Sequence, residues 1–184
     1  MKKLVFCIIA SALCAFTMQD NSLYITRDAH VWFLSQARLE NIEAHTHQGQ
    51  SLINIKTGKI AFSIQVKSFE FKKELMQEHF NERYMETDKY PKATFEGSIT
   101  NIGQLDLSKP GNYTGNVEGD LTMHGVTKHM KATAAIVAAN GSISAKSVFK
   151  ITVAEYKIEI PEQKADNIAP TLDINVEATY TPKQ

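Results

Sequence analysis

Residues 58–68, GKIAFSIQVKS, alternate between apolar and polar side chains. Ile60, Phe62 and Ile64 fall on one face of an extended chain, while Ala61 and Ser63 fall on the other. Because successive side chains of a β-strand point to opposite faces of the sheet, this pattern predicts a strand with one buried face and one face in water. Such a strand needs partners, and similar stretches lie on both sides of it in the chain.

The same alternation recurs through most of the sequence. It is clearest in TLDINVEATY (171–180) and SISAKSVFKITV (142–153), and weaker in KATFEGSI (92–99), GNYTGNVEGDLTM (111–123), VWFL (31–34) and LINI (52–55). Turn residues separate these stretches, and Asn140-Gly141 is the clearest signal for a two-residue hairpin. Roughly eight short antiparallel strands joined by local hairpins predict one all-β domain, either a barrel or a sandwich.

One segment, residues 69–91, breaks the alternation. It carries apolar side chains at helical spacing, which predicts one short amphipathic helix ending before Tyr90-Pro91. The apolar positions are Phe71, Leu75, Met76, Phe80 and Tyr84. A row of glutamates lies four residues apart along the same segment and is typical of a solvated helix face. These are Glu70, Glu74, Glu78, Glu82 and Glu86.

The N-terminus has the pattern of an export signal. Two lysines precede an uncharged apolar run, residues 4–16, which is too short for a membrane-spanning helix. We expect residues 1–17 to be a cleaved signal and residues 18–184 to be the mature domain, located in the periplasm or secreted. Removing the signal would also remove Cys7 and Cys14, leaving no thiol. A buried N-terminal helix is the alternative interpretation.

The charges balance, with 20 Lys and Arg against 20 Asp and Glu. No excess of either sign points to nucleic acid or to an anionic membrane surface. We therefore expect no nucleic-acid partner and no stable membrane span.

Three histidines are the candidates for chemistry. His45 and His47 would share one face of a strand, but a metal site needs further ligands, and their polar neighbours indicate an exposed strand end or loop. His124 lies in GDLTMHGVTKH (119–129), where Gly125 predicts a tight turn between two strands. A histidine base also needs a nucleophile or substrate, and the sequence has no G-x-S-x-G motif. We predict no catalytic residue and no metal site.

Small residues dominate 131–147, KATAAIVAANGSISAKS. Two neighbouring strands would then carry little bulk, which leaves space inside a barrel for an apolar ligand. Close packing of another element against these strands is an equally good explanation.

Two stretches resemble the characteristic motifs of the YceI-like family: YPKATFEGSI (90–99) and GDLTMHGVTKHMKATA (119–134). FKITVAEYKIEIP (149–161) and LDINVEATY (172–180) resemble its closing strands, and Val31-x-Phe33 resembles its opening strand. The commoner family pattern has an Arg-Asp-x-His-Leu run where this chain has residues 75–80. The resemblance implies an exported bacterial protein with a lipocalin-like, eight-stranded antiparallel β-barrel that binds polyisoprenoid-type lipids.

The resemblance also implies a site. A polyisoprenoid or other long-chain lipid would lie inside the barrel, in a carrier or storage role, with no enzymatic activity and no cofactor other than the bound lipid. The candidate wall residues are Val31, Phe33, Ile60, Phe62, Ile64, Phe95, Val117, Leu121, Phe149, Ile151, Ile174 and Val176. The alternatives are a metal-dependent or hydrolytic enzyme that uses His45, His47, His124 and the glutamates, or an interaction module with a filled barrel. The oligomeric state, monomer or dimer, stays open.

Overall fold

A computed structural model describes residues 22–183. The expected signal, and the boundary between residues 17 and 18, lie outside the described residues. Nine strands form one continuous antiparallel sheet. They are β1 (Leu23–Gln36), β2 (Asn41–Asn54), β3 (Lys59–Gln65), β4 (Glu70–Phe71), β5 (Lys92–Ile99), β6 (Gly111–Met123), β7 (Val126–Ala139), β8 (Ser142–Thr152) and β9 (Thr171–Pro182).

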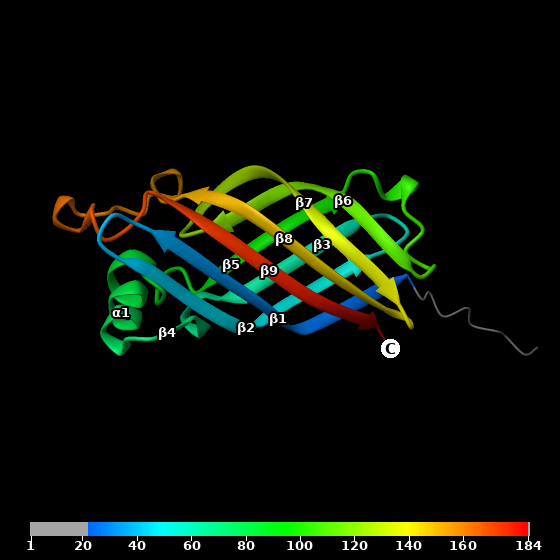
Figure 1. The fold of residues 1–184 in the computed structure, drawn as a ribbon, viewed down its shortest axis with the longest axis horizontal. Coiled ribbons are helices and arrows are strands. Elements are labelled where there is room, and N and C mark those ends of the chain that lie inside the picture. Colours follow the sequence, from blue (N-terminus) through cyan, green and yellow to red (C-terminus); the bar gives the residue numbers. More distant parts are fainter. Residues whose placement is uncertain (1–21, 184) are drawn as a thin grey trace, which may run out of the picture.

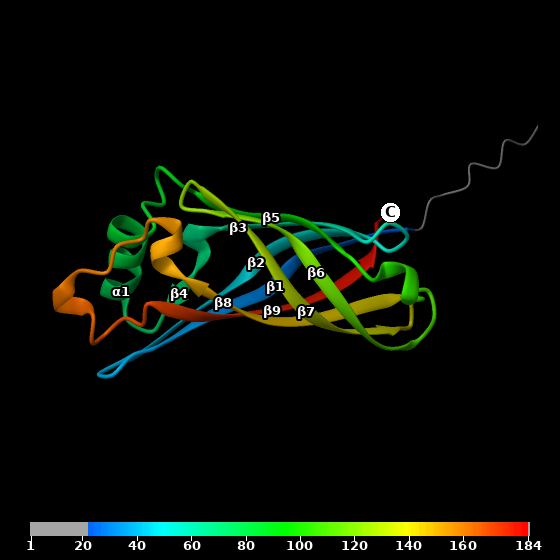
Figure 2. The same ribbon diagram turned by 90° about the horizontal axis from the view of Figure 1, so that it is seen from above.

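Eight of these strands close into a barrel. The order of hydrogen-bonded neighbours is β1-β9-β8-β7-β6-β5-β3-β2, and β2 pairs again with β1. The two-residue strand β4 adds to β2 outside this ring. Figures 1 and 2 show the barrel as an elongated body with strands inclined to its long axis. The predicted eight-stranded antiparallel β-barrel is confirmed.

The two predicted turns have the backbone that hairpins of this length require. His124 and Gly125 have φ of 51° and 72°, and Asn140 and Gly141 have φ of 51° and 75°. Positive φ at both central residues matches the twist of the flanking strands, which explains the asparagine and the glycines. The first turn joins β6 to β7 and the second joins β7 to β8.

The helical segment is shorter than the sequence predicts. The α-helix α1 spans Glu74–His79 and continues as one π-helical stretch, η2 (Phe80–Tyr84). The prediction that Phe71 belongs to this helix is wrong. Phe71 lies in strand β4, where its backbone pairs with Ala44 of β2. The glutamate row is also broken, since Glu86 follows η2 with a φ of 43°. Short 3-10 turns complete the chain: η1 (Val66–Ser68), η3 (Ile102–Gln104), η4 (Val153–Tyr156) and η5 (Glu162–Lys164).

The two ends of the barrel differ. At one, here called the closed end, buried apolar side chains fill the interior. The start of β1 and the end of β9 lie at this end (Figure 1). The filling side chains include Ile53, Ile99, Leu107, Ile136, Ile143 and Tyr180. At the other, here called the helical end, α1, η2 and the segment 153–170 cover the barrel (Figures 1 and 2). The asymmetry means that an interior cavity can open only away from the closed end or through the wall.

Polar groups inside the closed end are paired. The hydroxyl of Tyr180 lies 3.0 Å from Ser51 Oγ, which in turn donates to the carbonyl of Ala61 at 2.9 Å. Burial raises the pKa of Tyr180, so the phenol stays neutral and can donate. Because each hydroxyl has a hydrogen-bond partner, burying these groups among aliphatic side chains does not leave an unpaired donor.

Candidate ligand-binding cavity

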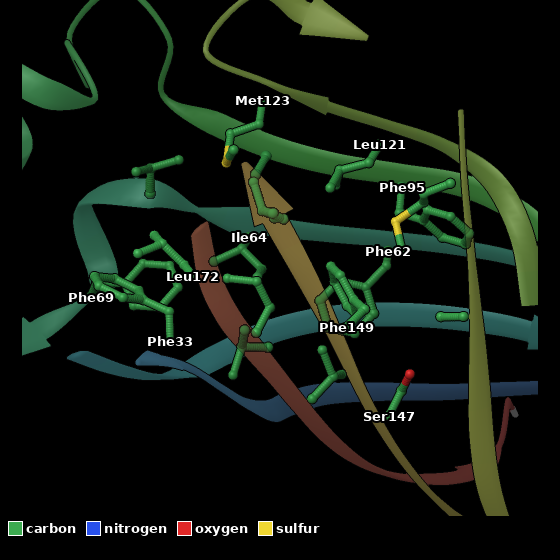
Figure 3. Close-up of a pocket in the computed structure, with 18 of the residues that line it drawn as sticks. Phe33, Phe62, Ile64, Phe69, Phe95, Leu121, Met123, Ser147, Phe149 and Leu172 are labelled. Atoms are coloured by element: carbon green, nitrogen blue, oxygen red, sulfur yellow. The ribbon is translucent and has the colours of Figure 1, made fainter. Parts of the chain in front are cut away.

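The barrel encloses a cavity of about 350 Å³ with an overwhelmingly apolar lining. Figure 3 shows aromatic and aliphatic side chains from opposite strands directed into it. All of the predicted wall residues line this cavity: Val31, Phe33, Ile60, Phe62, Ile64, Phe95, Val117, Leu121, Phe149, Ile151, Ile174 and Val176. Strand periodicity accounts for this result, because inward side chains recur at every second residue. Their contact with a ligand stays a prediction.

Four phenylalanines gather where the cavity meets the helical end. The ring centroid of Phe33 lies 5.6 Å from that of Phe69, 5.8 Å from that of Phe71 and 5.6 Å from that of Phe80. The rings come from β1, from the residue between η1 and β4, from β4 and from η2, so the helical segment contributes to the cavity lining. Phe69, Phe71 and Phe80 were not among the predicted wall residues. In the sequence, Phe71 and Phe80 fit the apolar spacing of the predicted helix, and Phe69 has no such signal.

A close backbone approach makes room for Phe95 in the middle of the wall. Gly97 of β5 lies directly opposite Gly119 of β6. A Cβ on Gly97 would meet the ring of Phe95 at 2.5 Å, and one on Gly119 would meet it at 2.8 Å. A glycine inside a strand often marks a bulge or a bend. The structure instead shows a regular ladder in which both glycines accommodate the aromatic ring.

The small residues of 131–147 serve both purposes that the sequence left open. Ala132, Ala145 and Ser147 line the cavity. Ala138, from the same strand as Ala132, is buried in the core of the closed end, where Ile136 and Ile143 border both that core and the cavity. The cavity therefore has space beside the small residues, and it ends where the bulky ones begin.

Four polar residues mark the opening of the cavity at the helical end: Glu40, His79, Lys164 and Asn167. The carboxylate of Glu40 accepts a hydrogen bond of 3.0 Å from Lys73 and one of 3.4 Å from Asn167. The bond from Lys73 lowers the pKa of Glu40, with Lys164 contributing at longer range. This opening can therefore present charged and hydrogen-bonding groups to the polar end of a ligand.

Hydrogen bonds fix the elements around this opening. Arg38, at the tip of the β1–β2 hairpin, donates two bonds to the carboxylate of Asp166, at 3.0 and 2.5 Å. The backbone N–H of Leu39 donates to the carbonyl of Asp166 at 2.9 Å. Ser35 Oγ accepts from the backbone of Ala169 at 2.9 Å. The hairpin and the segment 153–170 are thus joined at several points.

His124 is a turn residue, as predicted, but it is buried, with 8% of its surface exposed. Its Nδ1 lies 2.9 Å from the carbonyl oxygen of Tyr156, and its Nε2 lies 2.9 Å from Glu86 Oε2. A carbonyl only accepts, so Nδ1 carries a proton. The Tyr90 ring and the imidazole also pack edge to face, with ring centroids 4.6 Å apart. His124 therefore links the β6–β7 turn to two other segments of the helical end.

His45 and His47 lie within β2, so the prediction of a strand end or loop is wrong for them. Both join a ring cluster with His30 and Trp32 of β1, on the strand face opposite Val31 and Phe33. His30 Nε2 lies 3.0 Å from His45 Nδ1, and the rings of His30 and His47 stack at 4.2 Å. These histidines and His124 do not converge on one cavity. Within residues 22–183, no group of three or more His, Cys, Asp or Glu is arranged to hold a metal ion.

A closed antiparallel barrel around an apolar cavity defines the class: this chain is a lipocalin-like β-barrel. The YceI-like domain model matches residues 26–180, and the chain belongs to that family. No curated protein sequence matches it. In the described part of the chain, no helix has the length and apolar character needed to span a bilayer.

Several solved structures share the fold. A polyisoprenoid binding domain from Saccharophagus degradans, implicated in plant cell wall breakdown, is 15% identical, with a TM-score of 0.77 over 88% of this chain and 99% of that one. BcnA from Burkholderia cenocepacia is 18% identical, with a TM-score of 0.69 over 82% and 95% of the two chains. The YCEI protein from Campylobacter jejuni is 17% identical, with a TM-score of 0.57 over 81% and 89%.

Proposed function

We propose that this protein is an exported lipid-binding protein that holds a long apolar, polyisoprenoid-like ligand inside its barrel and acts as a carrier or store. The observation that carries the proposal is the apolar cavity of about 350 Å³, bounded by wall residues from nearly every strand. The similar domain from Saccharophagus degradans, described as polyisoprenoid binding, supports the choice of ligand class.

The energetics favour an apolar chain. Burying apolar surface contributes roughly 25 cal/mol per Å², so a long isoprenoid could bind with few polar contacts. The phenylalanines and branched aliphatic side chains of the wall provide that surface. The polar groups at the helical end, including Glu40 and Lys164, lie where a head group would emerge.

We propose binding rather than catalysis. The histidines that an enzyme would use are divided between the outer face of the barrel and the helical end. Export, with residence in the periplasm or outside the cell, is proposed on the pattern of residues 1–17.

Mass spectrometry of the protein purified from its native host tests the proposal. We expect a stoichiometric adduct in the native spectrum, and organic extraction should release a long-chain lipid from the same sample. A protein that carries no lipid, and that fails to take up added polyisoprenoids, would contradict the proposed function. The mass of the mature chain reports cleavage of the signal in the same experiment.

A further inference from the structure

The barrel wall is incompletely closed between β7 and β8. Their pairing runs only from Ala134↔Ser147 to Ala139↔Ser142. On the other side of each strand, pairing continues further, to Val126 in β7 and to Thr152 in β8. Residues 126–133 and 148–152 therefore face each other without a backbone ladder among the described residues. We call this part of the wall the β7–β8 seam, and Figure 1 shows the two ribbons separating along it.

The lining of the cavity includes residues from both sides of this seam. Met130 of β7 and Phe149 of β8 line the cavity from the two sides of the seam, and both are half-buried. Side chains from both edges of the seam therefore border the cavity.

Few interactions hold the seam together. Where the ladder ends, Ser147 Oγ donates to the carbonyl of Thr133 at 2.8 Å. At the other end, Tyr156 and Ile158 belong to the same apolar cluster as Met130, and close the gap by side-chain packing. By contrast, the opening at the helical end is fixed by the ion pairs Arg38–Asp166 and Lys73–Glu40 and by backbone hydrogen bonds.

We propose that the apolar ligand enters and leaves the barrel sideways, through the β7–β8 seam. This inference rests on the proposed function. Widening the seam breaks no backbone ladder, whereas widening any continuously paired part of the wall would break several hydrogen bonds at once. The flexible side chain of Met130 can move aside as an apolar chain passes. The head group could then remain outside the wall until the chain is buried.

A reversible crosslink tests the route. In a chain with Cys7→Ser and Cys14→Ser, Thr133→Cys and Val148→Cys place one thiol on each exposed edge, next to the last paired residues. All-trans-retinol, a fluorescent isoprenoid, is the probe, and stopped-flow fluorescence gives its association and dissociation rates. We expect oxidation to slow both rates at least tenfold, to leave their ratio within twofold, and to be reversed by a reductant. Equal slowing in both directions indicates a blocked route rather than a weakened site.

Two control disulfides distinguish closure of the seam from the effect of a crosslink elsewhere in the barrel. Val137→Cys with Ser144→Cys joins the same two strands at a pair that is already in register. Arg38→Cys with Asp166→Cys locks the helical end. We expect neither to change the rates. Slowing by the Arg38–Asp166 crosslink, with none from the seam crosslink, would overturn the proposal and assign entry to the helical end.

A bulky substitution gives an independent result if the seam disulfide fails to form. Ser147→Trp and Ala145→Trp add the same ring to β8, the first at the last paired residue, which borders the seam, and the second further inside the paired wall. We expect both rates for Ser147→Trp to fall at least fivefold below those for Ala145→Trp. Equal rates would contradict the seam as the route. A wild-type protein that binds neither retinol nor longer polyisoprenoids would instead contradict the proposed function itself.

Discussion

His124 and Glu86 lie 38 residues apart in the chain, yet His124 Nε2 and Glu86 Oε2 are 2.9 Å apart. This contact joins the β6–β7 turn to the segment that follows η2. Both residues have positive φ, at 51° and 43°, so two uncommon backbone conformations meet at one hydrogen bond. The arrangement indicates that His124 orders the helical end in addition to forming a turn.

Replacing His124 by Asn should therefore destabilise the protein. Asparagine tolerates the left-handed backbone of the turn but cannot reach both Glu86 and the carbonyl of Tyr156. We expect a loss of about 1–2 kcal/mol in the free energy of unfolding, because one of the two hydrogen bonds involves a charged group that is partly exposed. Urea denaturation measures it. His129→Asn, on the exposed outer face, is the control, and equal losses for the two variants would contradict this role.

Gly119→Ala should destabilise the barrel and disturb the cavity wall. The added Cβ would lie 2.4 Å from the carbonyl oxygen of Glu96 and 2.8 Å from the ring of Phe95. Overpacking of this kind costs about 1–3 kcal/mol. Thermal unfolding measures the loss. Gly103→Ala is the matched control, because its Cβ would meet nothing within 4 Å. A Gly119→Ala protein as stable as wild type would show that β5 and β6 separate freely here.

Phe62→Asp should abolish uptake of apolar ligands, because a carboxylate in the cavity wall is costly to bury and favours water there. Ala61→Asp changes the adjacent residue of β3, which is exposed and points outward, and should bind normally. Retinol fluorescence measures binding, and circular dichroism verifies that both variants fold. A folded Phe62→Asp protein with unchanged affinity would remove Phe62 from the predicted ligand-binding wall.

Two histidines should titrate on opposite sides of their ordinary pKa of 6.5. Hydrogen bonds to Glu118 and then Asp120 raise the pKa of His129, so its contribution to stability is present at low pH and is lost as pH rises through the raised pKa. Burial, followed by repulsion from His47, lowers the pKa of His30. Its contribution is present at high pH and is lost as pH falls through the lowered pKa.

Imidazole NMR measures both titrations in one sample. We expect His47→Gln to move the pKa of His30 upward, since it removes a neighbouring positive charge. The pKa of His129 should stay unchanged in that variant, because its partners belong to β6. An unchanged pKa for His30 would mean that its ring does not interact electrostatically with His47.

The sequence was informative wherever local periodicity determines structure. Alternation predicted the strands and the inward face of the wall, and the pairs His124-Gly125 and Asn140-Gly141 predicted two turns. The sequence-based prediction failed where contacts between residues far apart in the chain determine the local structure. Phe71 joins a strand because Ala44 offers a pairing partner, and His45 lies in a strand because β1 pairs alongside it. The seam between β7 and β8 has no local signal either, since alternation continues unchanged past the last paired residues.

The chain leaves the barrel where it entered. Tyr24 lies opposite Pro182, and the backbone N–H of Lys183 donates to the carbonyl of Leu23 at 2.8 Å. A short linker could join these neighbours, and new termini could be cut at the exposed turn of Asn140 and Gly141. Such a circular permutant would keep every strand partner while starting at β8. The cyclic order of the wall, rather than the order of synthesis, would then specify the fold.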